Sequence, residues 1–564
     1  MPKNVMKLIA PSPHRARNDF DLSHRHVYTL NFGELLPVSQ IETVPGDHIE
    51  FSVANLVRCM PLATSPFLRA KQHFDVWFVP YRDLWHNFDS FITQREQPVS
   101  SALKASSYCP REDFNEVISK FGALTSSDTD VVGHNLEKGC KKIYDLLGYG
   151  RIETNGSSVS GSFNIFRLLA YNYIWYNEYR NKYFDDGTYN IPINLLSIYN
   201  AAVLFNADAM QCDTVAHSKI SGSYAYSPLV AMFQMRYRQW KKDLFTGLLP
   251  SQQFGAVSSL TSKSLASTAL ALSNGTATPP SGSITASGGT ALAGGQPFGL
   301  SANAVTSSVS ILDLRKAEAL QIWRENALRS GNRVADNMRG HYGVESDFRD
   351  HRPTYLGSVD APLNISDIDS TAQTGQNQNG MLGDIAGKGL STIQNKTFKF
   401  DAKDFGVIMV LHSILPEAEY MSTGCDRNNQ LLESEDFFIP EYERLGFEGV
   451  ASGNFMMKSG SQHVVGYAPR YYGYKQKMDK CFGEFWSGGT LSQWCSPRTD
   501  VNQVLAATGA VSGIYPIGCL YVKPSLFDNN FAAGVNVTDQ FICDTYFDVD
   551  AVRPMSVMGL PYGD

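Results

Sequence analysis

A long segment without charged residues interrupts the middle of the chain and limits how the rest can fold. Residues 264–312 contain no Asp, Glu, Lys or Arg and consist largely of Ser, Thr, Ala and Gly. Such a composition buries too little large apolar surface to offset the conformational entropy lost on ordering. The segment is therefore either a linker between domains or an insertion into one domain. Neither side has the pattern of a complete fold, so the sequence favours an insertion at residues 255–310 in a single domain of residues 1–564.

Strand-like patterns flank this segment on both sides. Apolar and polar residues alternate in residues 48–57 and 541–549, and continuous apolar runs closed by Pro occupy residues 73–79 and 405–415. Helices are expected at residues 83–93, 163–183 and 312–330, where apolar residues recur at spacings of three and four. The sequence therefore predicts a mainly β fold with several helices and long loops.

Composition narrows the classes of function. The net charge of −7 excludes a globally basic nucleic-acid-binding protein and leaves only local contacts with nucleic acid. Only 18% of the residues are charged and 12% are aromatic, which is typical of an ordered chain. The nine cysteines include no C-x-x-C pair, which predicts reduced thiols rather than a disulfide framework or a zinc site. We expect neither a signal peptide nor insertion into a membrane.

Residues 1–26 form a basic N-terminal arm with little periodicity. Arg15, Arg17 and Arg25 are candidate contacts for phosphate groups of a nucleic acid, and His24 or Tyr28 is a candidate for stacking on its bases. His26 is counted among the same candidate nucleic-acid-binding residues. A solvated N-terminus without a ligand explains the same residues equally well.

The usual patterns of catalytic and cofactor sites are not found. Residues 386–389 (AGKG) have too short a spacing for a phosphate-binding loop, and Gly389 stands where Ser or Thr would bind magnesium, so a turn is expected there. The neighbouring His24 and His26 have no third ligand at metal-binding spacing. No nucleophile elbow, zinc-protease motif or EF-hand loop is found. We therefore expect no enzyme activity, no catalytic residue, no metal and no cofactor.

Several short motifs, taken in order along the chain, are similar to those of one family. They are HFDVWFVP at 73–80, YNYIWYNEYR at 171–180, KDLFT at 242–246, RPTYLG at 352–357, DFFIPE at 436–441, GYAPRY at 466–471 and RPM at 553–555. No single motif is diagnostic, but the ordered set extends over nearly the whole chain. The chain thereby resembles the major capsid proteins of the Microviridae, small icosahedral phages with single-stranded DNA. It is more similar to the gokushovirus-like branch than to the enteric-phage branch.

This resemblance implies a fold and a mode of assembly. The implied fold is an eight-stranded jelly roll with large inserted loops, an architecture that tolerates long connections between strands. The implied assembly is a T=1 shell of sixty copies around a circular single-stranded DNA genome. An aromatic-rich composition with few charges suits a surface that is repeatedly buried by symmetry. Residues 255–310 are then the candidate for a protrusion on the outer surface.

The resemblance also implies partners and a location. The expected partners are further copies of the chain, packaged single-stranded DNA, a small basic DNA-binding protein, an internal scaffolding protein, a pilot protein and a host surface receptor, with a glycan as the candidate receptor. The expected location is the virion, assembled in the cytoplasm of a bacterial host. A carbohydrate-binding β-sandwich of a phage or cell surface is the main alternative. A glycoside hydrolase is a weaker one, because no paired-acid signature is found.

Overall fold

The computed structural model describes residues 17–85, 88–92, 109–124, 128–130, 132–152, 161–181, 183–184, 217–219, 222–224, 228–253, 311–330, 352–369, 385–457, 463–485, 489–501, 519–532 and 534–557. The chain divides into two compact units, one made of Met1–Gln252 with Asp347–Asp564 and the other of Gln253–Ser346. The larger unit holds the β structure.

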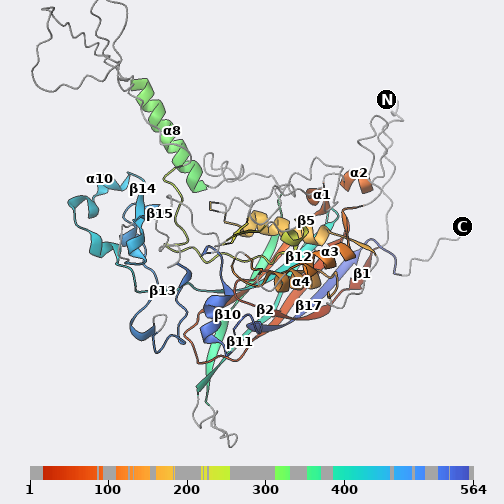
Figure 1. Ribbon diagram of the computed structural model, residues 1–564. Helices are drawn as coiled ribbons and strands as arrows, with labels where there is room; N and C mark the ends of the chain where they lie inside the picture. Colours follow the sequence, from red (N-terminus) through yellow and green to blue (C-terminus); the bar gives the residue numbers. More distant parts are fainter. Residues whose placement is uncertain are drawn as a thin grey trace, which may run out of the picture. The chain divides into compact units, whose positions relative to one another are not determined.

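Eight strand positions of the larger unit form one curled ladder of antiparallel strands (Figure 1). The first position is shared by two successive strands that both pair with the last strand of the chain. In chain order the strands are β1 (Asn18–Asp21) with β2 (His24–Leu30), β3 (Leu36–Thr43), β4 (His48–Cys59), β5 (Ala70–Pro80), β10 (Thr354–Asp369), β11 (Ile385–Asp401), β12 (Gly406–Pro416) and β17 (Phe541–Arg553).

The pairing order identifies the topology. One sheet runs from β1 and β2 through β17 and β4 to β11, and the other runs from β10 through β5 and β12 to β3. The two are joined at β10, because its residues 354–363 pair with β5 and its residues 364–369 pair with β11. We number the eight positions along the chain, counting β1 with β2 as the first and β17 as the eighth. Positions 1, 8, 3 and 6 then share one sheet, and positions 5, 4, 7 and 2 share the other. This alternation is the arrangement of a jelly roll, so the predicted mainly β jelly-roll fold is confirmed.

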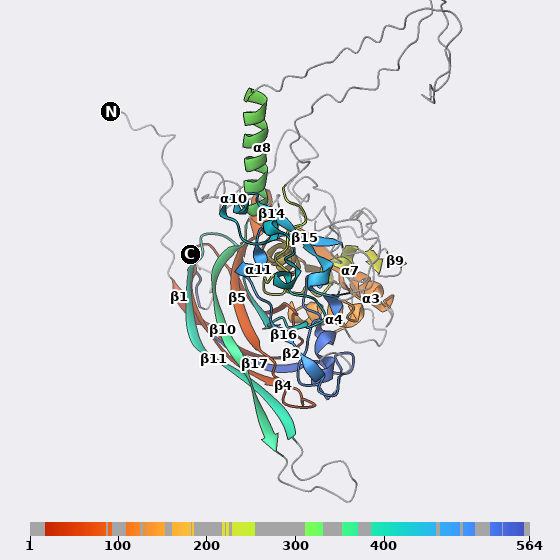
Figure 2. The same cartoon turned by 90° about the vertical axis from the view of Figure 1, so that its left-hand side faces the viewer.

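The two sheets curl toward each other (Figure 2), and the side chains between them form an apolar core. In β17 the buried residues alternate with exposed or half-buried ones from Phe541 to Ala551, as the sequence pattern predicts. Strand β12 is buried almost throughout, because it lies between β5 and β3 and is covered on both faces. The stretch expected to form a turn at residues 386–389 is instead part of β11, where Gly389 packs closely against the Cys59 side chain. A glycine in such a strand position marks a close approach rather than a chain reversal.

The long connection between β5 and β10 supplies most of the helices. Asp113 and Asn135 cap α3 and α4 by accepting hydrogen bonds from the backbone N–H groups of Asn115 and Lys138. The elements of this connection are α1 (Tyr81–Leu84), α2 (Phe88–Ile92), β6 (Arg111–Asp113), α3 (Phe114–Gly122), α4 (Leu136–Leu146), β7 (Ser162–Asn164), α5 (Phe166–Ile174), η3 (Trp175–Tyr179), β8 (His217–Lys219), β9 (Gly222–Tyr224), α7 (Pro228–Phe233) and α8 (Ile311–Ser330).

Three expectations for this connection can be compared with the structure. The helix expected at residues 83–93 is two short helices, α1 and α2. The helix expected at residues 163–183 is α5 followed by the π-helical turn η3. The helix expected after the uncharged segment is α8, which is the described part of the smaller unit. Residues 255–310, the expected insertion, lie outside the described residues, as does Arg15.

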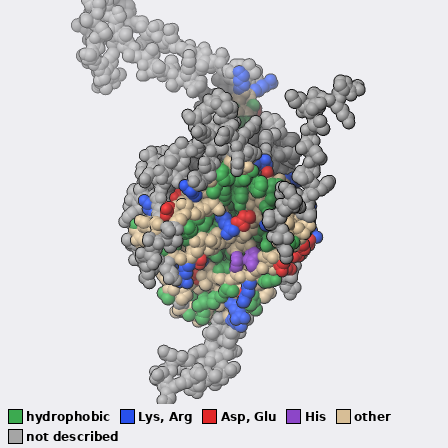
Figure 3. All heavy atoms as spheres, turned by 90° about the vertical axis from the view of Figure 1, so that its right-hand side faces the viewer, with side chains coloured by type: hydrophobic (Ala, Val, Ile, Leu, Met, Phe, Trp, Pro, Cys, Tyr) green, Lys and Arg blue, Asp and Glu red, His purple; other side chains and the backbone are tan. Residues whose placement is uncertain are grey.

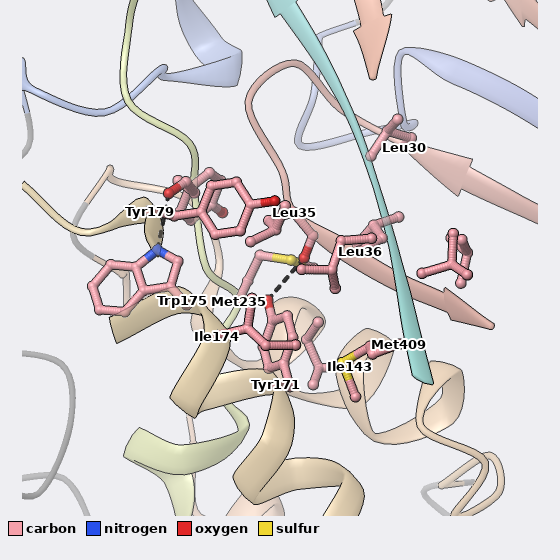
Figure 4. Close-up of a cluster of buried hydrophobic side chains, with 14 of the residues drawn as sticks. Leu30, Leu35, Leu36, Ile143, Tyr171, Ile174, Trp175, Tyr179, Met235 and Met409 are labelled. Atoms are coloured by element: carbon pink, nitrogen blue, oxygen red, sulfur yellow. Dashed lines mark hydrogen bonds between the residues drawn. The ribbon is translucent and has the colours of Figure 1, made fainter. Parts of the chain in front are cut away.

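Helix α5 fastens the inserted helices to the barrel (Figure 4). Its Tyr171 hydroxyl donates a 2.8 Å hydrogen bond to the backbone carbonyl of Leu35, just before β3. The Trp175 indole N–H donates a 3.1 Å bond to the carbonyl of Tyr237. Around these polar contacts Leu36, Met409 and their neighbours form one continuous buried cluster. The polar tips of the aromatic side chains are thus satisfied while their rings supply apolar contact area.

The connection between β12 and β17 forms a peripheral lobe, defined here as residues 417–501, followed by η10. The lobe contains two small sheets, of which β13 with β16 is parallel and β14 with β15 is antiparallel. Its elements and η10 are β13 (Tyr420–Met421), η5 (Arg427–Gln430), η6 (Ser434–Asp436), α10 (Pro440–Glu443), β14 (Phe447–Ala451), η7 (Ser452–Asn454), β15 (Val464–Pro469), α11 (Tyr472–Lys475), β16 (Lys480–Cys481), η8 (Gly483–Phe485) and η10 (Pro524–Asn530).

Within the part of the chain that the structure describes, no helix combines the length and the apolar character that crossing a membrane requires.

Candidate assembly and nucleic-acid surfaces

The predicted nucleic-acid residues that the structure describes are placed on the edge strand β2 or just before β1. Arg17 is exposed one residue before β1. Because Arg25 and the two histidines alternate along β2, Arg25 lies on one face of the sheet and His24 and His26 on the other. The three predicted residues of β2 are therefore split between two faces of the sheet, and Arg15 lies outside the described residues.

Arg25 lies on the outer face of the sheet, where it is paired. Its guanidinium donates two 2.7 Å hydrogen bonds to the Asp544 carboxylate from the neighbouring strand, and its side chain is 64% exposed. The Arg25 guanidinium lowers the pKa of Asp544, first through the hydrogen bond and then through its charge. At an exposed position such a pair adds little to stability, so Arg25 remains accessible to a competing phosphate.

Other carboxylates surround this pair. Asp19 and Asp21 lie on β1, and Asp548 and Asp550 lie on β17, where Asp550 is directly opposite Asp21. Slight desolvation and then the neighbouring carboxylates raise the pKa of Asp550. This end of the outer face is therefore acidic, and a polyanion would approach it only where arginines outnumber the carboxylates.

The two histidines link the open edges of the ladder. The ring of His24 stacks on Phe547 at 5.0 Å between centroids, and its Nε2 lies 3.1 Å from the Ser39 hydroxyl on β3. The Nδ1 of His26 lies 2.7 Å from the carbonyl oxygen of Val38, also on β3. These contacts join β2 to β3, the two ends of the strand order. The geometry therefore gives both rings a structural use at the barrel edge.

A hollow of about 740 Å³ opens between the barrel and the π-helical turn η3. Tyr355 of β10 is half-exposed, and its ring lies 4.8 Å from that of Trp77, its partner across the ladder. The Trp77 indole N–H donates a 3.0 Å hydrogen bond to the Tyr179 hydroxyl, which donates a 2.7 Å bond to Asp75. Burial first, and then the Asp75 carboxylate, raise the pKa of Tyr179 well above its ordinary value, so the phenol stays protonated and donates.

The charges in this hollow are balanced in pairs. Arg238 donates a 3.1 Å hydrogen bond to Asp75, and Arg352 pairs with Glu178 at 3.2 Å. An uncharged ligand with hydroxyl groups and one flat apolar face would meet aromatic rings and polar groups together here. Sequence reasoning used Trp77 and Tyr355 only as parts of motifs and missed this hollow. Both residues lie in the ordered motifs, Trp77 in HFDVWFVP and Tyr355 in RPTYLG. These motifs do not show that β5 pairs with β10, so the hollow could not be predicted from them.

The peripheral lobe exposes many large apolar side chains. Leu432 is 87% exposed and Leu445 is 64% exposed. Others of the lobe that are also exposed are Phe437, Phe438, Met457, Val464, Tyr474, Phe482 and Leu491. Hydrophobic patches interspersed with charged side chains also appear on the face shown in Figure 3. A contiguous apolar surface marks a site of protein–protein contact, and this lobe is therefore the candidate assembly surface.

Comparison with known proteins places the whole chain in a family. A family model described as "Capsid protein (F protein)" matches residues 9–562 of the chain. The chain belongs to this capsid protein family. Its membership confirms the resemblance to Microviridae major capsid proteins that the ordered motifs predict.

Two curated capsid proteins are similar along their whole length. The chain is 24% identical over 624 aligned residues to capsid protein VP1 of Chlamydia phage 1, and the alignment covers 97% of this chain and 95% of that protein. It is 22% identical over 593 residues to capsid protein VP1 of Bdellovibrio phage phiMH2K, with 98% and 96% covered. A phage capsid protein has a structural role, is a component of the virion and associates with copies of itself. The structural role, the location in the virion and the self-association expected from the motifs therefore hold for this capsid protein.

Proposed function

We propose that sixty copies of this capsid protein assemble into a T=1 icosahedral shell that encloses a circular single-stranded DNA genome. Family membership over residues 9–562 carries this proposal. The exposed apolar side chains of the peripheral lobe support it, because a stable interface buries such groups at its centre. Assembly is proposed to take place in the cytoplasm of a bacterial host.

Purified particles test the stoichiometry and the enclosed genome. We expect a particle mass close to that of sixty chains together with DNA that withstands nuclease until the shell is opened. A chain that remains a monomer or small oligomer in infected cells would overturn the proposal and restore the carbohydrate-binding β-sandwich as the leading alternative.

Substitutions in the lobe test the proposed interface. Leu432→Asp and Leu445→Asp place a charge at exposed apolar positions without disturbing the buried core. We expect folded subunits that no longer form particles, because a buried unpaired charge costs several kcal/mol. Asn429→Asp is the matched control, since it adds the same charge at an exposed polar position of the same lobe. If both leucine variants form particles as well as the control does, these leucines lie outside the interface.

We further propose that Arg15, Arg17 and Arg25 contact DNA phosphates and that His24 and His26, on the opposite face of β2, add contacts at the same edge of the barrel. The exposure of Arg17 and Arg25 supports this role, and the acidic residues around Arg25 limit it to a local contact. Changing all three arginines to Ala should reduce the DNA retained per particle, since each phosphate contact adds to binding through counterion release. Arg444→Ala, an exposed arginine of the lobe, serves as control. Unchanged DNA content in the triple variant would remove the proposed contact.

The remaining proposed partners are a small basic DNA-binding protein, an internal scaffolding protein and a pilot protein of the same virus. The net charge of −7 supports the first of these, because the shell by itself does not neutralise a genome. Residues 255–310 are proposed as an outer protrusion that takes part in host attachment.

Attachment to a host glycan is a second candidate function, and the hollow at Trp77 and Tyr355 favours it. An aromatic ring half-exposed beside polar groups suits the apolar face of a sugar. Tyr355→Ala should weaken binding of particles to immobilised host glycans by about tenfold or more, with particle yield unchanged. Equal binding by the variant would leave the hollow without this role.

A further inference from the structure

Three side chains with metal-ligating atoms converge at the base of the peripheral lobe. They are Glu419, Cys481 and Cys495, and one donor atom from each lies within 4.8 Å of the others. The sequence predicts no metal site because these residues are far apart and form no C-x-x-C pair. Folding of the lobe is what brings them together.

Backbone hydrogen bonds hold the three segments in place independently of any ligand. Glu419 directly precedes β13, and Cys481 ends β16, which pairs with β13 in parallel. The Ser422 N–H donates a 3.2 Å bond to the Cys481 carbonyl, and the Arg498 N–H donates a 2.8 Å bond to the Glu419 carbonyl. The segment containing Cys495 is thereby tied to Glu419. The site is preorganised, which lowers the cost of binding a ligand there.

Buried charge anchors the third segment more firmly. Arg498 is fully buried and pairs with Asp500 at 2.8 Å. Its guanidinium also lies over the Trp240 ring, 4.5 Å from the centroid. Because Arg498 is three residues from Cys495, this anchor restricts where the Cys495 thiol can lie.

The distance between the Cys481 and Glu419 donor atoms fits a cation with tetrahedral coordination. The Cys481 Sγ lies 3.6 Å from the Glu419 Oε2. A zinc ion bound to sulfur at about 2.3 Å and to oxygen at about 2.1 Å with tetrahedral angles places those two ligands about 3.6 Å apart. The other carboxylate oxygen, Oε1, faces Arg69 at 3.7 Å, so the carboxylate is already oriented with Oε2 toward the thiol.

We propose that Glu419, Cys481 and Cys495 bind a thiophilic divalent cation of the zinc class. Two thiolates select such a cation over magnesium or calcium, which prefer oxygen ligands. Three protein ligands leave a fourth position for water, and Cys495 is only half-buried, so that position is reachable from solvent. The bound cation fastens three segments of the lobe at one point. This inference concerns the folded chain and does not depend on the proposed shell geometry.

Metal uptake by the full-length chain tests the proposal. Particles or subunits are fully reduced, exposed to Zn²⁺, separated from free metal and analysed for zinc per chain, with Co²⁺ used in parallel for its sulfur-to-metal charge-transfer absorption. We expect about one tightly held ion per chain and a rise in melting temperature with added Zn²⁺, since a ligand that binds the folded state stabilises it. Cys481→Ser and Cys495→Ser should each weaken binding by about 100-fold or more, and Glu419→Gln by about tenfold or more.

Cys425→Ser is the matched control, because Cys425 is another half-buried thiol of the lobe that lies outside the cluster. It should bind zinc as the unmodified chain does. If Cys481→Ser does not fold, Cys495→Ser still decides the matter, since that thiol is less buried. Equal uptake by all variants, or no uptake by the reduced unmodified chain, would overturn the proposal. A disulfide between Cys481 and Cys495 in untreated particles, together with no zinc uptake after reduction, would also overturn it.

Discussion

At the scale of single residues, His412 illustrates a buried polar group that ties the barrel together. It lies in the centre of β12, stacks on Phe74 at 4.0 Å between centroids, and has its Nδ1 2.7 Å from the Tyr28 hydroxyl. Burial first, and then the nearby His73, lower the pKa of His412 to about 3. The imidazole is therefore neutral in the folded chain at any pH near neutrality.

This lowered pKa predicts how stability depends on pH. Below the ordinary histidine pKa of about 6.5 the unfolded chain binds a proton that the folded chain does not bind until about pH 3, so the stability contributed by His412 is present above pH 6.5 and lost as the pH falls toward 3. The loss amounts to about 5 kcal/mol. His412→Asn should lower stability at pH 7 but flatten its decline between pH 6.5 and 4 in denaturant titrations. An unchanged decline in His412→Asn would contradict this origin of the pH dependence.

A second residue-scale prediction concerns Asp539. Its carboxylate is nearly buried and accepts hydrogen bonds from Lys138 at 2.7 Å and Lys142 at 3.0 Å, and Lys142 also bonds Glu34 at 2.7 Å. Burial by itself would raise the pKa of Asp539, but the two ammonium groups lower it well below its ordinary value. The carboxylate thus stabilises the fold above the unfolded pKa of about 3.9, and this contribution is lost as the pH falls further.

Asp539→Asn should therefore destabilise the unassembled subunit by about 3 kcal/mol at pH 7, because Lys138 loses its carboxylate partner and the buried Lys142 ammonium keeps only Glu34. The difference from the unmodified chain should shrink as the pH falls below about 4, because the unfolded chain then binds a proton at Asp539 while the folded chain still holds the carboxylate charged. Urea denaturation at several pH values measures this. A difference that stays constant across the pH range would contradict the assigned ion pairs.

At the scale of elements, the close packing of adjacent strands explains where glycine is required. Gly406 begins β12, and a Cβ atom there would lie 2.5 Å from the Val79 carbonyl oxygen and 2.7 Å from the Phe78 ring. The nearest atom belongs to the backbone of β5 and therefore cannot move aside easily. Gly406→Ala should lower the free energy of unfolding by about 1–3 kcal/mol, as overpacked core substitutions do.

The control for this change is Gly122→Ala at the end of α3, where a Cβ atom would meet nothing within 4 Å. That substitution should leave the melting temperature unchanged or slightly raised, since alanine favours a helix more than glycine does. Similar losses in both variants would show that the contact of Gly406 with β5 is not the cause.

At the scale of the whole molecule, the jelly roll carries two long connections without losing its pairing order. Residues 81–353 connect β5 to β10, and residues 417–540 connect β12 to β17. Long loops cost little additional closure entropy, because that cost grows only with the logarithm of length. The barrel therefore acts as a scaffold, and the surfaces proposed for assembly and attachment lie mainly on what is inserted into it.

Protease treatment of intact particles tests the proposed position of residues 255–310. We expect the first cleavage in this segment, because its Ser-, Thr-, Ala- and Gly-rich composition favours exposure, while the barrel strands stay whole. Mass spectrometry of the fragments locates the cut. Protection of the segment under conditions that cleave elsewhere on the particle would contradict an outer protrusion.

Sequence alone was enough for the features that depend on local patterns and on ordered motifs. The alternation of Phe541 to Val549 predicted which side of β17 is buried, because side chains of a strand point alternately to its two faces. Apolar periodicity predicted α5 and α8, and the ordered motifs predicted the capsid protein family and its jelly roll. The turn expected at residues 386–389 was wrong, because local glycine content cannot distinguish a chain reversal from a close strand contact.

Only the tertiary structure decided which distant residues meet. It placed Arg25 beside Asp544 and turned His24 toward β3, and it brought Cys481 within 3.6 Å of Glu419. Each of these contacts depends on the register and order of strand pairing between segments hundreds or tens of residues apart. Local patterns carry no information on that pairing, because many pairings satisfy the same alternation. The family and the elements were therefore legible in the sequence, whereas the charge pairs, the hollow and the proposed metal site arise only when the strands are paired.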